Sequence, residues 1–257
     1  MKVVVCVKQV PNTNEVKINP KTGTLIRDGV ESILNPDDDN ALEAALQMKD
    51  GNADTTVTVI TMGPPQAKEV LVECMAKGAD DSVLLSSRAF GGADTWATSN
   101  TIAGAIKRIA DYDIIFAGRQ AIDGDTAQVG PQIAEKLGIP QVTYVERIIS
   151  CNGKEVTVRR QLEDGYEVIQ VPMPCLLTVV KELNKPRYMS VKGIYEAYEK
   201  DITVWNENDI PVRADAPCAG FAWNPANSVP SQRLRRNRKM TFLPTRMYGS
   251  LRSRGQV

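Results

Sequence analysis

The stretch YDIIFAGRQAIDGDTAQVGPQIAEKLG, residues 112–138, indicates the fold class of this chain most clearly. It begins with an apolar run of strand length and ends with apolar residues three and four positions apart, which is the spacing of a helix. We therefore predict a buried strand that passes through a short polar loop directly into a helix. In parallel sheets such loops lie at the carboxyl edge of the strands, where α/β proteins bind their ligands.

The same alternation runs through the first 148 residues. Strand-length segments rich in β-branched residues are separated by segments with helical spacing. Continuous apolar strands separated by single helices predict a parallel sheet that is covered by helices on both faces. We expect the strands at 2–10, 55–63, 81–87, 112–118 and 140–148, and the helices at 40–48, 64–79, 95–110 and 126–138.

After residue 148 the pattern changes to antiparallel strands. Asn152-Gly153 is a two-residue hairpin signal, and a second turn at residues 163–165 separates two alternating segments. One more buried strand follows at 175–180, and we expect a long irregular segment over 183–217 that projects as an arm. The predicted fold class is α/β, with a parallel sheet between two helical layers, an antiparallel extension and a C-terminal arm.

The composition excludes several kinds of catalysis. The 257 residues include no histidine, which excludes Ser-His-Asp and Cys-His catalysis and the HExxH zinc site. The five cysteines form no CxxC pair, so we expect neither a metal site nor a disulfide framework. No apolar run approaches the roughly 20 residues of a membrane span, and no signal peptide is indicated. We expect a cytoplasmic protein without a membrane partner, whose redox chemistry would belong to a cofactor.

The charge of the chain is divided unevenly. All 31 acidic residues precede Ala216, whereas eight of the 31 basic residues follow Pro230. The first 230 residues, with 23 basic residues, therefore carry a net charge of −8 that the neutral total conceals. An Arg-rich ending without periodicity is typical of a basic tail, and one hypothesis is that it binds nucleic acid. We favour a reading-frame change near residue 216 and expect no nucleic-acid partner.

The loop at 118–131 contains neither GxGxxG nor GxxxxGK[ST], so the usual dinucleotide and Walker signatures are absent. Free N–H groups at the start of the following helix, residues 126–130, nevertheless predict an anion site such as one for a phosphate. Glycines would allow tight turning and close approach, an acidic or hydroxyl side chain would cap the helix, and a proline would fall in its first turn. These residues are Gly124 and Gly130, Asp125 or Thr126, and Pro131. The alternative is a capped strand–helix junction without a ligand.

The segment VRRQLEDGYEVIQVPMPCLLT, residues 158–178, carries a second pattern. A basic residue is followed by an acidic turn, a further glutamate, a proline, two aliphatic residues and a threonine. The residues are Arg160, Glu163, Asp164, Gly165, Glu167, Pro174 and Thr178. In this order they resemble the signature of the electron transfer flavoprotein beta subunit. The resemblance extends from Lys2 to about Arg213 and includes CVKQV, NPDDDNALEAAL, MGPPQA, AFGGADTWATS, DGDTAQVGP and LNKPRYMSV.

This resemblance implies a heterodimer with an alpha subunit and an adenine nucleotide between the strand ends of this chain. One branch of the family holds AMP without a redox role, and another holds FAD. The stretch DGDTAQVGP resembles the FAD branch, so we expect FAD, with AMP as the alternative. Cys6 and Met62 would otherwise be core residues at strand ends. The cofactor-binding residues that the resemblance implies are Cys6, Asn35, Met62, Asp94, Thr95, Thr98, Arg119, Asp123, Gly124, Asp125, Thr126, Ala127, Gln128, Val129, Gly130 and Pro131.

The FAD branch performs flavin-based electron bifurcation. It takes an electron pair from NADH and divides it between an acyl-CoA dehydrogenase and ferredoxin or flavodoxin. The resemblance implies this activity for the heterodimer, with this chain as an electron carrier that has no catalytic or metal-ligating side chains of its own. An AMP-containing, non-bifurcating subunit is the nearest alternative. A nucleotide-binding module of the adenine-nucleotide hydrolase-like fold, without a redox role, is the second.

Residues 184–200 correspond to the recognition loop of the family, an exposed arm that inserts an aliphatic anchor into the dehydrogenase. The matching anchor is Val191, and Tyr188, Met189 and Lys192 complete the expected docking surface. Exposed apolar residues in a polar arm usually mark an interface, although a purely local structural role is the alternative.

The resemblance also divides the chain into parts. Nothing after Asp215 resembles the C-terminal arm of the family, which leaves contacts of this arm with the alpha subunit open. We expect an α/β nucleotide-binding domain with its antiparallel extension over 1–182, a partner-recognition loop and arm over 183–215, and an atypical basic tail over 216–257.

Overall fold

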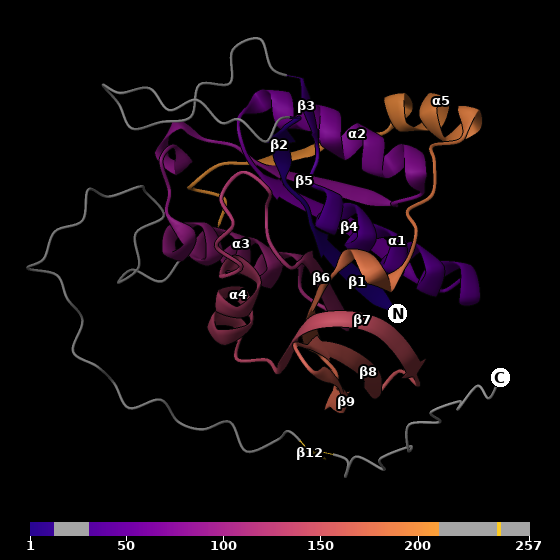
Figure 1. The fold of residues 1–257 in the computed structure, drawn as a ribbon. Helices are drawn as coiled ribbons and strands as arrows, with labels where there is room; N and C mark the ends of the chain where they lie inside the picture. Colours follow the sequence, from indigo (N-terminus) through magenta and orange to yellow (C-terminus); the bar gives the residue numbers. More distant parts are fainter. Residues whose placement is uncertain (13–30, 211–240, 243–257) are drawn as a thin grey trace, which may run out of the picture.

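The computed structural model describes residues 1–12, 31–210 and 241–242, and within these residues ten strands form one sheet. Its parallel part consists, in spatial order, of β11 (Thr203–Trp205), β5 (Asp81–Leu85), β4 (Thr56–Met62), β1 (Lys2–Cys6), β6 (Ile114–Gly118), β10 (Cys175–Val179) and β7 (Gln141–Cys151). Strand β1 lies inside the sheet, between β4 and β6 (Figure 1). The predicted parallel sheet is confirmed.

Helices cover both faces of the parallel strands. Successive side chains of a strand point to opposite faces, so Val3 and Val5 of β1 pack in one core, whereas Val4 packs in the other. The main helices are α1 (Pro36–Gly51), α2 (Lys68–Lys77), α3 (Thr95–Ile109) and α4 (Val129–Leu137). Helices α1 and α2 contribute to the first core, and α3 and α4 contribute to the second. The sheet is therefore buried on both sides, as its continuous apolar strands predict.

An antiparallel extension continues the sheet beyond β7. The elements are β8 (Glu155–Leu162), β9 (Gly165–Pro172) and β12 (Thr241–Phe242), each antiparallel to the strand before it. The hairpins predicted at Asn152-Gly153 and at residues 163–165 are confirmed by these pairings. A separate two-stranded sheet pairs β2 (Gln9–Pro11) with β3 (Ser32–Leu34). Short 3-10 turns are η1 (Pro65–Ala67), η2 (Arg88–Phe90) and η3 (Lys181–Leu183).

The prediction of a long irregular segment over 183–217 is wrong. Helix α5 (Val191–Glu199) and strand β11 lie within it, and β11 pairs with β5 at the edge of the sheet. The N–H of Gly193 donates a hydrogen bond to the hydroxyl of Ser190, which therefore caps α5. Ala197 of α5 is buried in the core that α1 and α2 share. Tertiary packing of a short helix thus outweighs the Pro- and charge-rich composition.

Several predicted boundaries also shift. The strand predicted over 2–10 ends at Cys6, because residues 9–11 turn away and pair with β3. The helix predicted over 40–48 begins at Pro36, where proline suits the first turn and three aspartates lie at the positive end of the helix dipole. The helix predicted over 64–79 begins only at Lys68, after η1.

The order of the strands reverses beside β1. From β1 the chain passes outward to β4 and β5, and it then returns to the other side of β1 as β6. In open α/β sheets the loops diverge at such a point, and the crevice between them is the usual ligand site. The strand order therefore places a candidate site above β1, β4 and β6.

The basic tail predicted over 216–257, together with the idea of a reading-frame change, lies outside the described residues except for β12. Among the helices that the structure describes, none combines the length and the apolar character that crossing a membrane requires.

Candidate functional site

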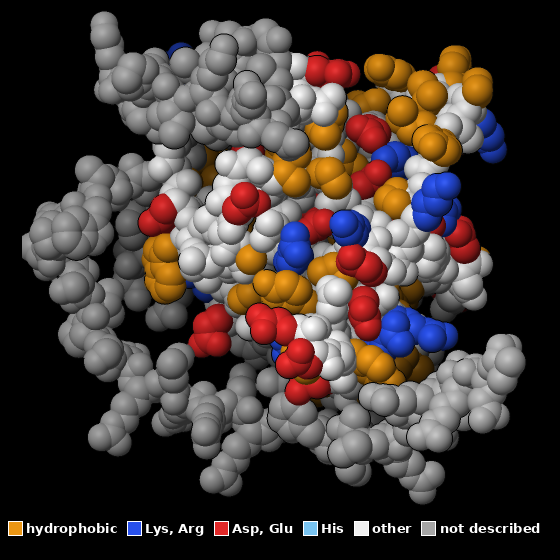
Figure 2. Space-filling model, viewed as in Figure 1, with side chains coloured by type: hydrophobic (Ala, Val, Ile, Leu, Met, Phe, Trp, Pro, Cys, Tyr) orange, Lys and Arg blue, Asp and Glu red, His pale blue; other side chains and the backbone are white. Residues whose placement is uncertain are grey.

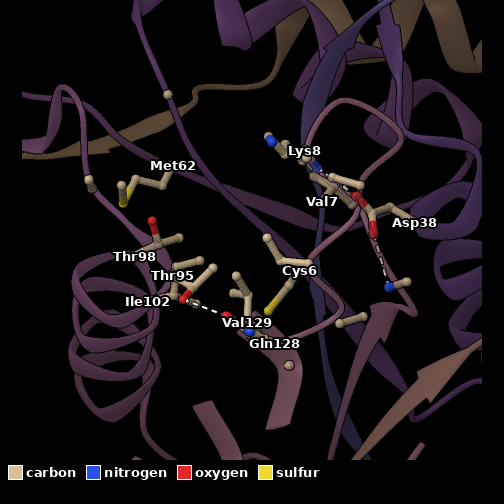
Figure 3. A pocket seen from close by; sticks show the side chains of 18 of the residues that line it. Cys6, Val7, Lys8, Asp38, Met62, Thr95, Thr98, Ile102, Gln128 and Val129 are labelled. Atoms are coloured by element: carbon tan, nitrogen blue, oxygen red, sulfur yellow. Dashed lines mark hydrogen bonds between the residues drawn. The ribbon is translucent and has the colours of Figure 1, made fainter. Parts of the chain in front are cut away.

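A cavity of about 740 Å³ opens at the carboxyl ends of β1, β4 and β6. Cys6 and Met62, the last residues of β1 and β4, line it. Figure 3 shows Lys8 and Asp38 on one side of the cavity and Met62 and Thr98 on the other. The volume falls within the roughly 300–1,000 Å³ of small-molecule and cofactor sites. The cavity is the candidate functional site.

Most of the predicted cofactor-binding residues lie around this one cavity. Those that line it are Cys6, Met62, Asp94, Thr95, Thr98, Arg119, Gly124, Thr126, Ala127, Gln128, Val129 and Gly130. The other four, Asn35, Asp123, Asp125 and Pro131, lie in the neighbouring loops and in the first turns of the helices. The structure thus brings together residues from distant parts of the sequence, while their contact with a cofactor stays a prediction.

Asp38, in the first turn of α1, joins two strand ends at the cavity wall. Its carboxylate oxygens accept hydrogen bonds from the backbone N–H groups of Lys8 and Gly118, each at 2.9 Å. Burial raises the pKa of this carboxyl group to about 7, although hydrogen bonds from Gly118, Asn35 and Lys8 act in the opposite direction. A Cβ atom at position 118 would collide with Asp38, so this strand end requires glycine.

Cys6 forms part of the cavity wall without being a nucleophile. Burial raises the pKa of its thiol to about 12, and the nearby Asp38 carboxylate acts in the same direction. Since the thiolate is the reactive form of cysteine, this thiol is inert at neutral pH. Cys6 therefore contributes a small apolar surface at the end of β1.

The two acidic residues of the loop between β6 and α4 hold the loop itself. Asp123, whose side chain is 2% exposed, pairs with Lys8 at 2.6 Å between Oδ1 and Nζ. Asp125 accepts a hydrogen bond from Nε2 of Gln120 at 2.8 Å. Asp125 and Ala127 both have left-handed backbones, with φ of 47° and 51°. Strain of this kind in non-glycine residues concentrates at functional sites, where the surroundings hold it in place.

The prediction that Asp125 or Thr126 caps α4 is wrong. The helix begins at Val129, and Gln128 before it makes no capping hydrogen bond through its side chain. The left-handed backbone at Asp125 and Ala127 delays the start of the helix. Pro131 falls in the first turn, as predicted.

Helices α3 and α4 both begin at the cavity and are joined there by side chains. The hydroxyl of Thr95 donates a hydrogen bond to Oε1 of Gln128 at 2.9 Å. Asp94 caps α3 by accepting a backbone hydrogen bond at 2.8 Å. A Cβ atom at Gly130 would lie 2.6 Å from Cγ2 of Thr178, so α4 packs closely on β10. The Asp94 carboxylate already occupies the positive end of α3, whereas the start of α4 carries no side-chain cap and favours an anionic ligand.

Two further predicted residues shape the loop. Asn35 is fully buried; its Nδ2 donates to the carbonyl oxygen of Gln120 at 2.9 Å, and its Oδ1 accepts from the N–H of Ile122 at 3.1 Å. Arg119 lies 3.5 Å from the carboxylate of Asp37 and 5.9 Å from the centroid of the Tyr144 ring. Both residues fix the path of the loop beside the cavity.

The sequence reasoning missed several lining residues. Lys8 and Asp38 supply charge to the wall, and Phe90 and Ile102 supply apolar surface. Lys8 lies two residues after the end of β1, whereas the predicted strand continued through it to residue 10, so its place at the strand end was not apparent. Asp38 was less visible, because three consecutive aspartates do not show which of them faces inward.

The predicted docking residues lie on and before α5. Tyr188 and Val191 are 89% and 88% exposed, and Met189 is partly exposed. Lys192 is also exposed and pairs with Glu196 within the helix. Figure 2 shows hydrophobic side chains gathered over α5, at the upper right. Ile194, Tyr195 and Tyr198 add to this surface and were missed, because the segment was expected to be irregular.

Comparison with known proteins identifies the family of this chain. The family model described as the electron transfer flavoprotein domain matches residues 22–210. The chain belongs to the electron transfer flavoprotein family.

Two of three relatives of this chain are named for reductases of CoA esters, and the third is named as an electron transfer flavoprotein subunit. The chain is 66% identical over 216 residues to the caffeyl-CoA reductase-Etf complex subunit CarD of Acetobacterium woodii, covering 84% of this chain and 82% of CarD. It is 63% identical over 212 residues to the electron transfer flavoprotein subunit beta of Clostridium acetobutylicum, covering 82% and 81%. It is 54% identical over 208 residues to the acryloyl-CoA reductase electron transfer subunit gamma of Anaerotignum propionicum, covering 79% and 77%.

These comparisons confirm the family that residues 158–178 predict. The chain is a beta subunit of an electron transfer flavoprotein, and its function is electron transfer.

Proposed function

We propose that the cavity at the ends of β1, β4 and β6 binds FAD. As a heterodimer with an alpha subunit, the cytoplasmic protein would pass electrons from NADH to an acyl-CoA dehydrogenase and to ferredoxin or flavodoxin by flavin-based bifurcation. The cavity volume of about 740 Å³ carries the cofactor assignment. This volume lies in the upper part of the roughly 300–1,000 Å³ range of cofactor sites, which favours the larger nucleotide, FAD, over AMP.

The residues around the cavity fit a phosphate-bearing nucleotide. The first N–H groups of α4, at Val129 and Gly130, have no acceptor within the helix. They can donate hydrogen bonds to an anionic group in the cavity. The hydrogen bond between Thr95 and Gln128 keeps the starts of α3 and α4 at a fixed separation. The phosphates would bind at the start of α4, which carries no side-chain cap.

The other walls suit the remainder of the nucleotide. Cys6 and Met62 offer small or flexible apolar contacts, and Ile102 extends this surface along α3. Thr98 offers a hydroxyl group on the same side of the cavity as Met62 (Figure 3). Cofactor sites are usually lined by apolar side chains with a small number of polar groups.

The absence of histidine agrees with this assignment. Bound FAD would supply the acceptance of a hydride from NADH and the release of electrons to the two acceptors. The residues of this chain then need only to bind the cofactor, orient it and tune its electron density. Thr126, Gln128 and Arg119 carry hydrogen-bonding groups at the cavity for that purpose.

The partner assignment rests on the relatives and on α5. CarD is named for a caffeyl-CoA reductase complex, and a second relative is named for acryloyl-CoA reductase. Both names describe reductases of unsaturated acyl-CoA compounds, the reverse direction of acyl-CoA dehydrogenase chemistry. We assign the docking of such a dehydrogenase to the exposed apolar face of α5, with Val191 as anchor.

The purified heterodimer, mixed with its dehydrogenase, tests this proposal. We expect NADH oxidation when the unsaturated acyl-CoA and ferredoxin are both present, and we expect it to stop when either acceptor is omitted, because bifurcation couples the two transfers. Full-rate oxidation with the dehydrogenase and its substrate alone would contradict bifurcation and would favour a simple electron shuttle that contains AMP. A colourless heterodimer that binds ATP would favour a non-redox nucleotide-binding module.

A further inference from the structure

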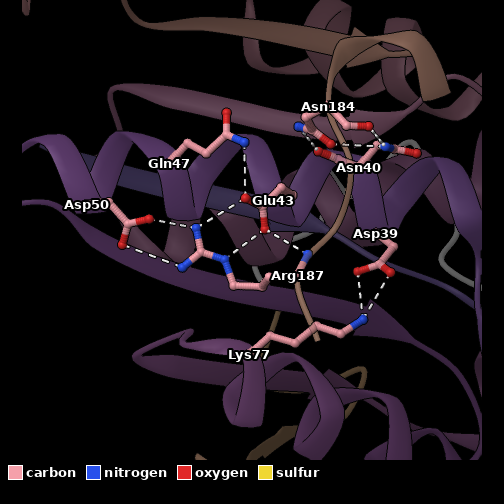
Figure 4. Close-up of polar contacts among 8 residues, drawn as sticks. All are labelled: Asp39, Asn40, Glu43, Gln47, Asp50, Lys77, Asn184 and Arg187. Atoms are coloured by element: carbon pink, nitrogen blue, oxygen red, sulfur yellow. Dashed lines mark hydrogen bonds and ion pairs between the residues drawn. The ribbon is translucent and has the colours of Figure 1, made fainter. Parts of the chain in front are cut away.

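The residues that lead into α5 are fixed to α1 by one arginine (Figure 4). Nε and Nη2 of Arg187 lie 2.8 Å and 3.1 Å from the two carboxylate oxygens of Glu43. Nη2 also donates to Oδ2 of Asp50 at 2.6 Å. Glu43 and Asp50 belong to the same helix, so a single guanidinium group binds the arm to two turns of α1.

The two acidic partners of Arg187 differ in burial. The side chain of Glu43 is 7% exposed, and it also accepts hydrogen bonds from the backbone N–H of Arg187 at 3.2 Å and from Nε2 of Gln47 at 3.0 Å. The side chain of Asp50 is 61% exposed, so water and salt screen it. The contact with Glu43 is therefore the strong half of the clamp, and the contact with Asp50 is the weak half.

A pair of asparagines adds a second attachment. Nδ2 of Asn40 donates to the backbone carbonyl oxygen and to the side-chain oxygen of Asn184, each at 2.9 Å. In return, Nδ2 of Asn184 donates to the carbonyl oxygen of Asn40 at 3.0 Å. This reciprocal pair gives the buried side-chain amide of Asn40 its hydrogen-bond partners. It also attaches the chain to α1 at Asn184, three residues before Arg187.

The far end of α5 is attached as well. Nζ of Lys200 donates to the carbonyl oxygen of Ala79 at 2.9 Å, just after α2. Between the two ends, Ala197 is 1% exposed, and a Cβ atom at Gly193 would collide with the carbonyl oxygen of Ala76. Helix α5 therefore lies directly on α2 and is held at both ends.

Only the outer face of α5 is left uncovered in the part of the chain that the structure describes. Tyr188 and Val191 are almost fully exposed, and Tyr195 and Tyr198 are 71% and 76% exposed. Aromatic and aliphatic side chains on a fixed backbone lose little conformational entropy when they bind a partner, because the backbone is already ordered. Such a face fits an apolar pocket with hydrogen-bond acceptors for the tyrosine hydroxyl groups.

We propose that Arg187 is a positioning residue: by pairing with Glu43 and Asp50 it fixes the start of α5, so that the helix meets the acyl-CoA dehydrogenase as a preformed docking surface. The choice of partner rests on the proposed function. The fixed placement of α5 rests only on the contacts within this chain, and it can be measured without a partner.

The experiment uses the full chain in its heterodimer and two measurements. Amide hydrogen exchange over residues 191–199 reports the placement of α5, and steady-state rates at increasing dehydrogenase concentration give KM for the dehydrogenase separately from kcat. In Arg187→Met we expect exchange in α5 to be about tenfold faster and KM to be about tenfold higher, with kcat and nucleotide content unchanged.

Three further variants control this result. Asp50→Asn removes only the screened half of the clamp and should change both quantities by less than about twofold. Arg187→Lys keeps the charge without the planar fork and should lie between the wild type and Arg187→Met. Arg187→Met combined with Glu43→Gln removes the unpaired buried carboxylate, and it should retain the faster exchange of α5 without general loss of stability.

Each contrary result has its own meaning. Unchanged exchange over 191–199 in Arg187→Met would overturn the clamp, whatever the partner is. Faster exchange with an unchanged KM would overturn the role of Arg187 in docking. A wild-type heterodimer that transfers no electrons to the dehydrogenase would overturn the proposed function, while the exchange measurement would still decide the clamp.

Discussion

Gly130 shows how closely a single residue fits beneath the cavity. A Cβ atom there would lie 2.6 Å from Cγ2 of Thr178, which is closer than side chains pack. We expect Gly130→Ala to lower the free energy of unfolding by about 1–3 kcal/mol, as overpacking does. Gly124→Ala is the matched control, because a Cβ atom there meets nothing within 4 Å. Equal effects of the two substitutions on urea denaturation would contradict this packing.

Asp38 makes stability depend on pH near neutrality. Its folded-state pKa of about 7 lies above the ordinary value of 3.8, so the folded chain holds this proton where the unfolded chain has lost it. The contribution of Asp38 to stability is therefore complete at low pH and is lost as the pH rises towards about 7. Between pH 5 and pH 8, the free energy of unfolding of the wild type should fall by about 2.5 kcal/mol relative to Asp38→Asn. Parallel pH profiles of the two proteins would contradict the raised pKa.

Two lysines at opposite ends of β1 provide a matched pair of tests. Lys8 pairs with Asp123, whose side chain is 2% exposed, whereas Lys2 pairs with Asp111, whose side chain is 82% exposed. Loss of a charged partner of a buried group costs more than loss of a surface pair. We expect Lys8→Met to lower the free energy of unfolding by about 1–3 kcal/mol and Lys2→Met to change it by less than about 0.5 kcal/mol. Equal denaturation midpoints would show that the Asp123 pair is as weak as a surface contact.

At this scale the sequence allowed part of the site to be predicted. The loop from Gly124 to Gly130 was predicted at the carboxyl edge of the sheet and lines the cavity there, because it directly follows a parallel strand and such loops meet at one edge. The orientation of its acids was not predictable. Asp125 was expected at the helix start, yet it supports the loop through Gln120, and this depends on a left-handed backbone that composition does not reveal.

At the scale of elements, the strongly periodic segments were predicted and the weak ones were not. Helix α3 begins and ends within one residue of its prediction, since its apolar spacing is regular and Asp94 caps it. Helix α5 was missed, because five of its nine residues are charged or aromatic and its inner face is little more than Gly193 and Ala197. Its existence depends on Arg187 and on α2, which are tertiary contacts.

The exposed face of α5 leads to a prediction about docking. Val191→Asp introduces a charge at a position where the side chain is 88% exposed, so the fold should be unaffected. In an apolar pocket of the dehydrogenase the same charge would be desolvated, and we expect KM for the dehydrogenase to rise by at least about tenfold. Val191→Leu keeps an aliphatic anchor and should retain docking. A Val191→Asp heterodimer with the KM of the wild type would exclude Val191 as the anchor.

For the molecule as a whole, the alternation of apolar strands and helices was enough to predict the α/β class and the two helical layers. The order of the strands was not predictable, because the sequence does not say on which side of β1 each crossover returns. That order decides where the cavity forms: β6 returns beside β1, and the loops after β1, β4 and β6 then enclose one space. Periodicity predicted only the fold class, whereas the signature in 158–178 predicted the family.

The most direct test of the account is to count the nucleotides in the purified heterodimer. The chain would be produced together with its alpha subunit, its nucleotides released with acid, and FAD and AMP measured per heterodimer. We predict two FAD and no AMP, one FAD being held in the cavity of this chain. One FAD and one AMP would contradict the account and would leave this subunit as a scaffold around a nucleotide without a redox role.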